Sequence, residues 1–490
     1  MATFFNFKIQ EGKKMQETLL NLVANANKYL SDYILIILLI GTGLFFTIKT
    51  KFVQVRCFGE GMKKVFGNIK LRGGKRAGGL SSFQALATAI AAQVGTGNIV
   101  GASGAILLGG PGAIFWMWVI AFLGMATIYA EATLAQETRI TDADGNIHGG
   151  PVYYIKKAFP NGFGTFLAIF FAIAAVLALG FMGSMVQSNS IAESMNTAFG
   201  IPNYVVGAVL AIICAIIFIG GIQRIASVAE KIVPIMASLF LVGGVIVLLS
   251  NLSGLVEGIG MIFKFAFTPS ALIGGGIGYA LKTAISQGAK RGLFSNEAGM
   301  GSTPHAHAMA NVEKPHDQGV AAMIGVFIDT FVVLTMTALV VITTLYTGEN
   351  GLGNMSPEAY NAVISGKEMF CGIALSKTNA MQLAVTEGFP AFMSGLGKGF
   401  VAICLLFFAF TTIIGWNFFG KINAQYLFKN NKAMTVVYSV IAIVFIVLGT
   451  LASNDLVWEL TDFFNYLMVI PNVIALVALY KIVVKNSKNK

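Results

Sequence analysis

Long apolar runs separated by short polar segments extend along almost the whole chain. Many of these runs approach about 20 residues, the length that an α-helix needs to cross the hydrocarbon core of a bilayer. We expect spans at about 33–48, 83–108, 113–136, 166–192, 204–220, 226–249, 271–310, 320–346, 399–426, 434–451 and 456–484. The pattern therefore predicts an all-α membrane protein with about eleven transmembrane helices.

Small and polar residues interrupt the run at 83–108. Gly95, Thr96, Gly97 and Asn98 stand at its centre. Glycines loosen a helix, and lipid cannot satisfy the backbone groups that a break frees, so such a break is tolerated where it lines a cavity. Its carbonyls can bind a cation, and the N-terminus of the half-helix beyond it can bind an anion. The alternative is that the glycines only admit a neighbouring helix. The interleaved threonine and asparagine favour a binding site.

A second interruption lies in the stretch 271–310. As one straight helix this stretch would be about 60 Å long, twice the hydrocarbon thickness, so we expect a break at about 294–302. When the span at 33–48 is set aside, ten spans remain. The first of the first five and the first of the second five are the two with a break. Corresponding interruptions in two halves are typical of inverted-repeat transporters with a site near the bilayer midplane. We divide the chain into a polar lead (1–30), an extra span with a basic loop (31–80), two repeats (81–250 and 270–484) and a basic tail (485–490).

Charge and composition support a membrane protein. Hydrophobic residues make up 56% of the chain and charged residues 11%, whereas a soluble domain carries about a quarter charged residues. The loop at 49–79 is the most basic stretch, and the positive-inside rule places it in the cytoplasm, with the N-terminus outside and the C-terminus inside. The net charge of +11 is explained by such loops and the tail, so it does not indicate nucleic-acid binding. We expect a multi-pass protein of the cytoplasmic membrane.

Several kinds of chemistry are not indicated by the sequence. The four cysteines show no spacing typical of a disulfide framework, zinc site or redox motif, and the histidines form no metal-ligand pattern. No nucleophile–base arrangement, phosphate loop or dinucleotide fingerprint is present. The sequence therefore predicts a transporter rather than an enzyme.

Isolated polar residues inside the spans are candidates for binding. Thr411 and Thr412 offer two oxygen ligands without adding charge, although each hydroxyl could instead bond a carbonyl of its own helix. Gln187, in the second half of an apolar helix, could bind substrate or join helices. Trp416 lies one turn beyond Thr412, where it could form the wall of a small pocket or simply pack its ring.

Three carboxylates, Glu131, Glu297 and Asp329, are expected to lie within the membrane. Ionisable groups at this depth are costly and usually functional. We expect Glu297 to stay ionised against backbone amides of the second break, with Arg291 or Lys290 as its partner. We expect Glu131 to pair structurally with the broken helices. The alternative for Glu131 and Glu297 is that one of them carries a coupling proton.

Four motifs resemble the alanine or glycine:cation symporter family. They lie at 93–99 (QVGTGNI), 109–113 (GGPGA), 149–155 (GGPVYYI) and 291–302 (RGLFSNEAGMGS). The resemblance implies a leucine-transporter-like fold of five-plus-five inverted repeats with broken first and sixth core helices. It also implies sodium-coupled uptake of small neutral amino acids, chiefly alanine and glycine, with Na⁺ as the coupling ion.

The resemblance also implies site residues. Na⁺ would be held by Ala91, Val94, Thr411 and Thr412. Substrate would lie among Thr96, Gly97, Gln187, Phe294, Ser295 and Trp416. A second cation site would involve Gln93, Asn98 and Ser295. A proton-coupled symporter of the same fold is one alternative, and a cation channel is an alternative of another class.

Overall fold

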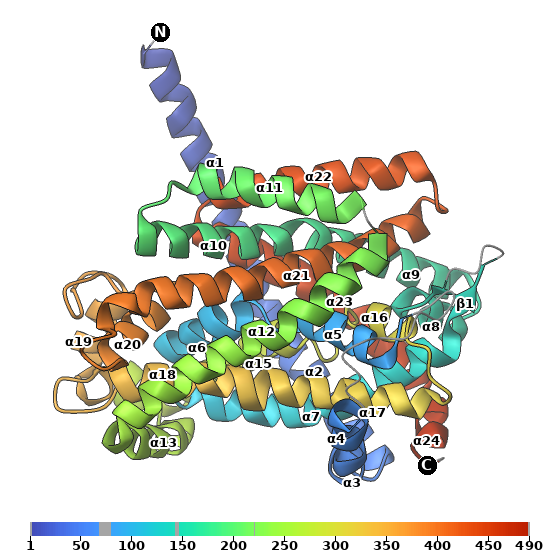
Figure 1. The fold of residues 1–490 in the computed structure, drawn as a ribbon, viewed down its shortest axis with the longest axis horizontal. Coiled ribbons are helices and arrows are strands. Elements are labelled where there is room, and N and C mark those ends of the chain that lie inside the picture. Colours follow the sequence, from blue (N-terminus) through green and yellow to red (C-terminus); the bar gives the residue numbers. More distant parts are fainter. Residues whose placement is uncertain (1, 68–79, 143–146, 220, 489–490) are drawn as a thin grey trace.

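The computed structural model describes residues 2–67, 80–142, 147–219 and 221–488, and most of them are helical (Figure 1). The segment 68–79 of the predicted basic loop and the end of the tail lie outside the described residues. A short antiparallel hairpin, β1 (Ile140–Thr141) with β2 (Ile147–His148), pairs Ile140 with His148.

The first helix begins much earlier than the sequence suggested. α1 (Ala2–Tyr29), a π-helical stretch (Leu30–Leu35) and α2 (Ile36–Lys49) form one continuous rod, and the N-terminal part of α1 projects from the body (Figure 1). The expected lead at 1–30 is therefore helical. Polar residues of this rod have partners: Nδ2 of Asn27 donates to the Glu459 carbonyl at 2.8 Å, and Asp32, in the π-helical stretch, pairs with Lys282 at 3.3 Å. Such contacts are invisible in a local hydropathy pattern.

A broken helix lies in the described part of the first half of the chain. After α3 (Val53–Arg56) and α4 (Phe58–Phe66), α5 (Ser82–Gln93) ends and the chain resumes as a π-helical turn (Gly97–Gly101) and α6 (Ala102–Gly109), bent by 47°. The following helices are α7 (Ala113–Thr138), α8 (Pro151–Ala158), α9 (Gly162–Ala175), a π-helical stretch (Val176–Met182), α10 (Gly183–Phe199), α11 (Asn203–Ile219), α12 (Gly221–Ser250) and α13 (Leu252–Phe267).

The second half contains the other break. α14 (Ser270–Ile273) precedes α15 (Ile277–Asn296), which stops inside the expected interval and is followed by the short α16 (Pro304–Ala308). The later helices are α17 (Pro315–Val326), a π-helical stretch (Phe327–Leu334), α18 (Thr335–Leu345), α19 (Pro357–Ile364), α20 (Ala380–Gly388), α21 (Gly397–Leu427), α22 (Lys432–Leu451), α23 (Asn454–Ala478) and α24 (Tyr480–Lys488). Two short 3₁₀ turns, Leu352–Asn354 and Ser394–Leu396, complete this half.

Within the described residues, eight helices are long and apolar enough to span a membrane, or nine when the bent α5–α6 pair counts as one span. α11 is apolar but shorter, at 17 residues. α15 carries Lys282, Lys290 and Arg291, which lower its hydropathy. The predicted total of about eleven spans and the five-plus-five repeat stay predictions.

The first broken helix lies in the centre of the molecule. Every residue from 85 to 107 is buried, and α5 and α6 are covered by later helices that include α12, α15 and α21 (Figure 1). A helix that is apolar all round and buried all round faces protein rather than lipid. This position lets the break use polar side chains of its neighbours.

Glycines allow α21 to cross the π-helical stretch Val176–Met182 at close range. A Cβ added at Gly420 of α21 would lie 2.3 Å from the Tyr438 hydroxyl and 2.9 Å from Cα of Gly180. The Gly180 backbone cannot move aside as a flexible side chain would, so α21 can keep this position only with glycine at 420.

We therefore expect Gly420→Ala to lower the free energy of unfolding by about 1–3 kcal/mol through overpacking. Thermal unfolding of the detergent-purified protein would measure the loss. Gly41→Ala is the matched control, because a Cβ there meets no atom within 4 Å and alanine is the better helix former. Equal melting temperatures for the two variants would contradict the close crossing.

Candidate functional site

Side chains satisfy the amides freed at the first break. α5 ends at Gln93, Val94 is extended, and helical structure resumes at Gly97. The Gly95 amide donates to Oδ1 of Asn98 at 2.9 Å. The Thr96 amide donates to Oε1 of Gln187 at 3.0 Å, and the Thr96 hydroxyl donates to the same oxygen. Polar partners from the protein thus take the place that water would fill outside the membrane.

Both glycines at this break also permit close approach. A Cβ at Gly95 would lie 2.3 Å from Oγ1 of Thr412, and a Cβ at Gly97 would lie 3.0 Å from the Phe294 ring and 3.1 Å from Cα of Ser295. These glycines therefore both interrupt the helix and allow neighbouring helices to approach it closely. Gly95 brings α21 to the break, and Gly97 brings α15.

A cluster of uncharged oxygens forms where α21 meets the break. Oγ1 of Thr412 lies 3.1 Å from the carbonyl of Ala91, 3.4 Å from that of Val94 and 3.1 Å from that of Phe408. Oγ1 of Thr411 lies 2.9 Å from the Phe408 carbonyl and 3.0 Å from the Phe407 carbonyl, both of its own helix α21. Of the four residues expected to hold Na⁺, Ala91, Val94 and Thr412 are in contact, whereas the Thr411 hydroxyl bonds carbonyls of its own helix. The Phe408 carbonyl, four residues before Thr412 on the same helix, joins this cluster.

Glu131 satisfies amides at the second break. After α15 ends, Glu297, Gly299 and Gly301 have positive φ angles of 59°, 93° and 81°. The amides of Gly299 and Gly301 donate to the Glu131 carboxylate at 3.1 and 3.0 Å, and Asn472 donates to it at 2.6 Å. The structural pairing expected for Glu131 is therefore present.

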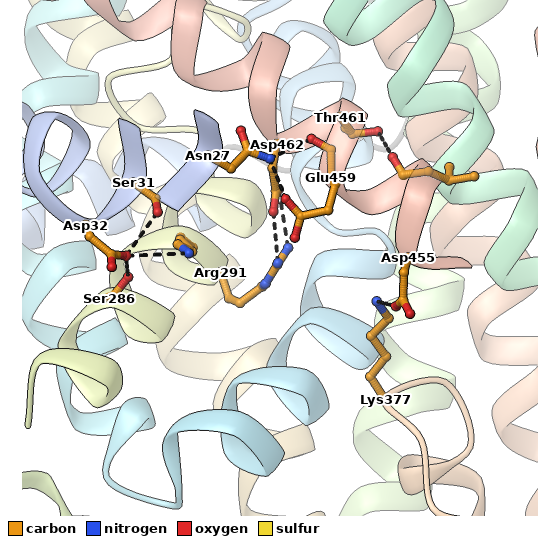
Figure 2. A network of polar contacts seen from close by, with 12 residues as sticks. Asn27, Ser31, Asp32, Ser286, Arg291, Lys377, Asp455, Glu459, Thr461 and Asp462 are labelled. Atoms are coloured by element: carbon orange, nitrogen blue, oxygen red, sulfur yellow. Dashed lines mark hydrogen bonds and ion pairs between the residues drawn. The ribbon is translucent and has the colours of Figure 1, made fainter. Parts of the chain in front are cut away.

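The partner expected for Glu297 was wrong. Its carboxylate accepts from the Ser302 hydroxyl and the Trp416 indole. Arg291 instead makes a bidentate contact to Asp462 of α23, at 2.9 and 3.3 Å (Figure 2). Lys290 lies 3.6 Å from Asp32. Side chains on a helix meet when they are three or four residues apart. Lys290 and Arg291 lie seven and six residues before Glu297, and α15 ends at Asn296, so neither cation reaches its carboxylate.

Asp329 gathers polar side chains from both broken helices. Asn98 donates to Oδ1 of Asp329 at 2.6 Å, and the hydroxyls of Ser295 and Thr330 each donate to Oδ2 at 2.9 Å. Gln93, which was grouped with Asn98 and Ser295, instead donates to the Asn296 carbonyl at 2.7 Å. The second cation site expected at Gln93, Asn98 and Ser295 therefore includes Asp329, which had not been assigned to it, and does not include Gln93.

The residues expected around substrate lie between the two breaks. Besides the Thr96–Gln187 contact and the approach of Gly97 to Ser295, the rings of Phe294 and Trp416 meet edge to face at 5.6 Å. Phe294 also lies 4.8 Å from Trp458, measured between ring centroids. Aromatic rings therefore limit the space at the breaks.

A cationic layer lies beyond Phe294. Arg291 and Lys377 both lie over the Trp458 ring, at 4.7 and 5.2 Å from its centroid. Lys377 pairs with Asp455 at 3.2 Å (Figure 2), and these two residues also line a cavity of about 640 Å³. Burial lowers the pKa of Lys377, against the opposing effect of Asp455 and with a further lowering from Arg291. Contacts thus run continuously from the cavity through Trp458 to Phe294.

The fold is of the leucine-transporter-like class. The structure matches one described as the crystal structure of MhsT in complex with L-phenylalanine, with a TM-score of 0.55 and 14% identity, over 83% of this chain and 99% of that chain. At this identity the likeness concerns the fold alone. It confirms the helical membrane fold expected from the broken spans.

The family follows from sequence comparison. The profile of the sodium:alanine symporter family matches residues 16–489, and the chain belongs to this family. The sodium/alanine symporter AgcS of Methanococcus maripaludis is 39% identical over 471 residues, 96% of each chain. The probable sodium/glutamine symporter GlnT of Bacillus subtilis is 37% identical over 469 residues, 96% of this chain and 90% of that protein. The protein is thus a transporter rather than an enzyme, and the resemblance stated from the motifs is confirmed.

Replacing Glu131 should destabilise the second break. Glu131→Ala leaves the amides of Gly299 and Gly301 without their acceptor, and each orphaned buried donor costs about 1–3 kcal/mol. We expect a large drop in melting temperature and yield. Glu131→Gln, which keeps one acceptor oxygen, should lose less. Wild-type stability of Glu131→Ala would show that the carboxylate is not the support of this break.

Proposed function

We propose that the protein is a sodium-coupled symporter that takes up small neutral amino acids, chiefly alanine and glycine, by alternating access. The observation that carries this proposal is the contact of the Thr412 hydroxyl with the carbonyls of Ala91 and Val94 at the first break. Carbonyls of an unwound membrane helix are typical ligands of a coupling ion in transporters.

The ion would replace hydrogen bonds of the threonine hydroxyls. Five oxygens are available to it, from the carbonyls of Ala91, Val94 and Phe408 and the hydroxyls of Thr411 and Thr412. All are neutral, so the ion keeps its full charge in the site. Its inward movement then gains about 2.3 kcal/mol per 100 mV of membrane potential, which can drive accumulation of substrate.

Substrate would bind between the breaks. The half-helix that begins at Gly97 presents its positive dipole end there, which favours the substrate carboxylate. The ammonium group would meet oxygens near Ser295 and the second break. Phe294 and Trp416 lie edge to face, and in this proposal they would limit the substrate side chain to little more than a methyl group.

The Asp329 cluster supports a second cation-binding position, formed with Asn98 and Ser295. Because it contains a carboxylate, this position could take a proton in place of Na⁺. The proton-coupled alternative therefore rests on Asp329, whereas the sodium-coupled proposal rests on the neutral oxygens around Thr412.

We propose an orientation in the cytoplasmic membrane with the N-terminus outside and the C-terminus inside. The basic residues on α4, Lys63 and Lys64, would then lie on the cytoplasmic face together with the basic C-terminal helix α24. This arrangement follows the positive-inside rule.

Uptake of labelled alanine into proteoliposomes tests the coupling. We expect accumulation with an inward Na⁺ gradient, competition by glycine, and little competition by leucine or glutamine, because the aromatic rings restrict side-chain size. Accumulation driven by a proton gradient without Na⁺ would favour the alternative based on Asp329. Sodium conductance that needs no amino acid, without uptake, would indicate a channel.

Replacing Thr412 tests the ion site. We expect Thr412→Ala to raise the sodium concentration for half-maximal uptake by about tenfold, because one contact to a charged ligand is worth about 1.5–3 kcal/mol. Thr412→Ser keeps the hydroxyl and is the matched control. An unchanged sodium dependence in Thr412→Ala would remove this residue from the site.

A further inference from the structure

Three metal-ligating side chains from distant parts of the sequence meet at α4, away from both breaks. Cys57 directly precedes α4, Glu60 lies in its first turn, and His316 lies at the start of α17. One ligand atom from each lies within 4.8 Å of the other two. Thiolate, imidazole and carboxylate are the ligands that Zn²⁺ takes in proteins. We propose that these residues bind a divalent cation of the Zn²⁺ class and that the ion ties α4 to α17.

The histidine ring is held as a metal ligand would need. Nδ1 of His316 lies 2.8 Å from the Tyr129 hydroxyl. Nε2 is buried and lies 3.3 Å from Oε1 of Glu60, yet it makes no hydrogen bond of acceptable geometry within the described residues. A ring that donates Nδ1–H to Tyr129 presents its Nε2 lone pair to an ion. Metal-binding histidines characteristically make such a second contact, which fixes the ring.

The three side chains can close around an ion with little movement. Ligand atoms in a tetrahedral zinc site lie roughly 3.5 Å apart, as the metal–ligand distances of about 2.0–2.3 Å require. Cys57 and His316 are each 1% exposed, whereas the Glu60 side chain is 30% exposed. An ion would therefore enter from the Glu60 side, where water can supply a fourth ligand.

The neighbouring side chains of Lys64 and Arg56 do not block a metal ion from Cys57, Glu60 and His316, because each has other partners. Lys64 lies 3.6 Å from Glu60 but also pairs with Asp317, and its side chain is 34% exposed. Arg56 donates to the carbonyls of Thr50 and Ser487. A divalent ion can therefore displace Lys64 from Glu60 while Asp317 retains it.

The site connects to the transport site through one helix. α17 continues without interruption into the π-helical stretch that carries Asp329, so an ion between α4 and α17 would restrain the helix that contacts both breaks. This consequence for transport rests on the proposed function, whereas metal binding does not. We expect bound Zn²⁺ to slow uptake.

Metal binding is tested on the purified full chain in detergent, with Zn²⁺ alone as the probe. Equilibrium dialysis should give about one ion per chain, and Co²⁺ should give a thiolate charge-transfer band, because cysteine ligates both metals. Cys57→Ser should lose the band and most of the bound ion. Cys371→Ser, which removes an exposed cysteine elsewhere, should retain both. Equal binding by these two variants, or no binding by the wild type, would overturn the proposal.

Milder variants keep the test independent of folding. Glu60→Gln and Tyr129→Phe should weaken Zn²⁺ binding by about tenfold or more while the protein remains monodisperse. In proteoliposomes, Zn²⁺ should slow alanine uptake by the wild type and by Cys371→Ser but not by Cys57→Ser. Binding without any effect on uptake would refute the restraint on α17. A wild-type protein that binds Zn²⁺ but takes up no alanine would count against the proposed function and leave the metal site standing.

Discussion

The need to satisfy backbone groups at two breaks inside the membrane governs this structure. Lipid offers no hydrogen bonds, so each amide freed at a break must find a partner within the protein. At the first break the partners are Asn98 and Gln187, and at the second they come from Glu131. The helices that supply these side chains are therefore fixed around the breaks, and the bundle is arranged about its least regular backbone.

The same constraint joins the proposed ion and substrate positions. Ala91 and Val94 supply the carbonyls near Thr412, and Thr96 follows two residues later with its amide bonded to Gln187. A change in the backbone at one position must therefore be felt at the other, because they share one short non-helical segment. Physical coupling of ion and substrate would follow from this shared segment without any longer pathway.

Local patterns predicted the breaks but only part of their surroundings. Glycines between polar residues marked both interruptions, and the hydroxyls of Thr411 and Thr412 were recognisable because they stand in an apolar run. The Phe408 carbonyl has no signal in its side chain, and Asp329 joins Asn98 only because α17 and its continuation pack against both broken helices. Closeness in the sequence was also a poor guide to ion pairs, because Arg291 lies six residues before Glu297 but pairs with Asp462.

The sequence by itself determined the class of protein, the apolar spans and the places where helices must break, because these depend on hydropathy and glycine content within a few residues. Tertiary structure alone decided which side chains meet. It paired Arg291 with Asp462 rather than Glu297, and it brought His316 to Cys57 and Glu60, where the cysteine and histidine spacing had indicated no metal site. Contacts between distant segments depend on helix packing in three dimensions, which no local pattern of residues contains.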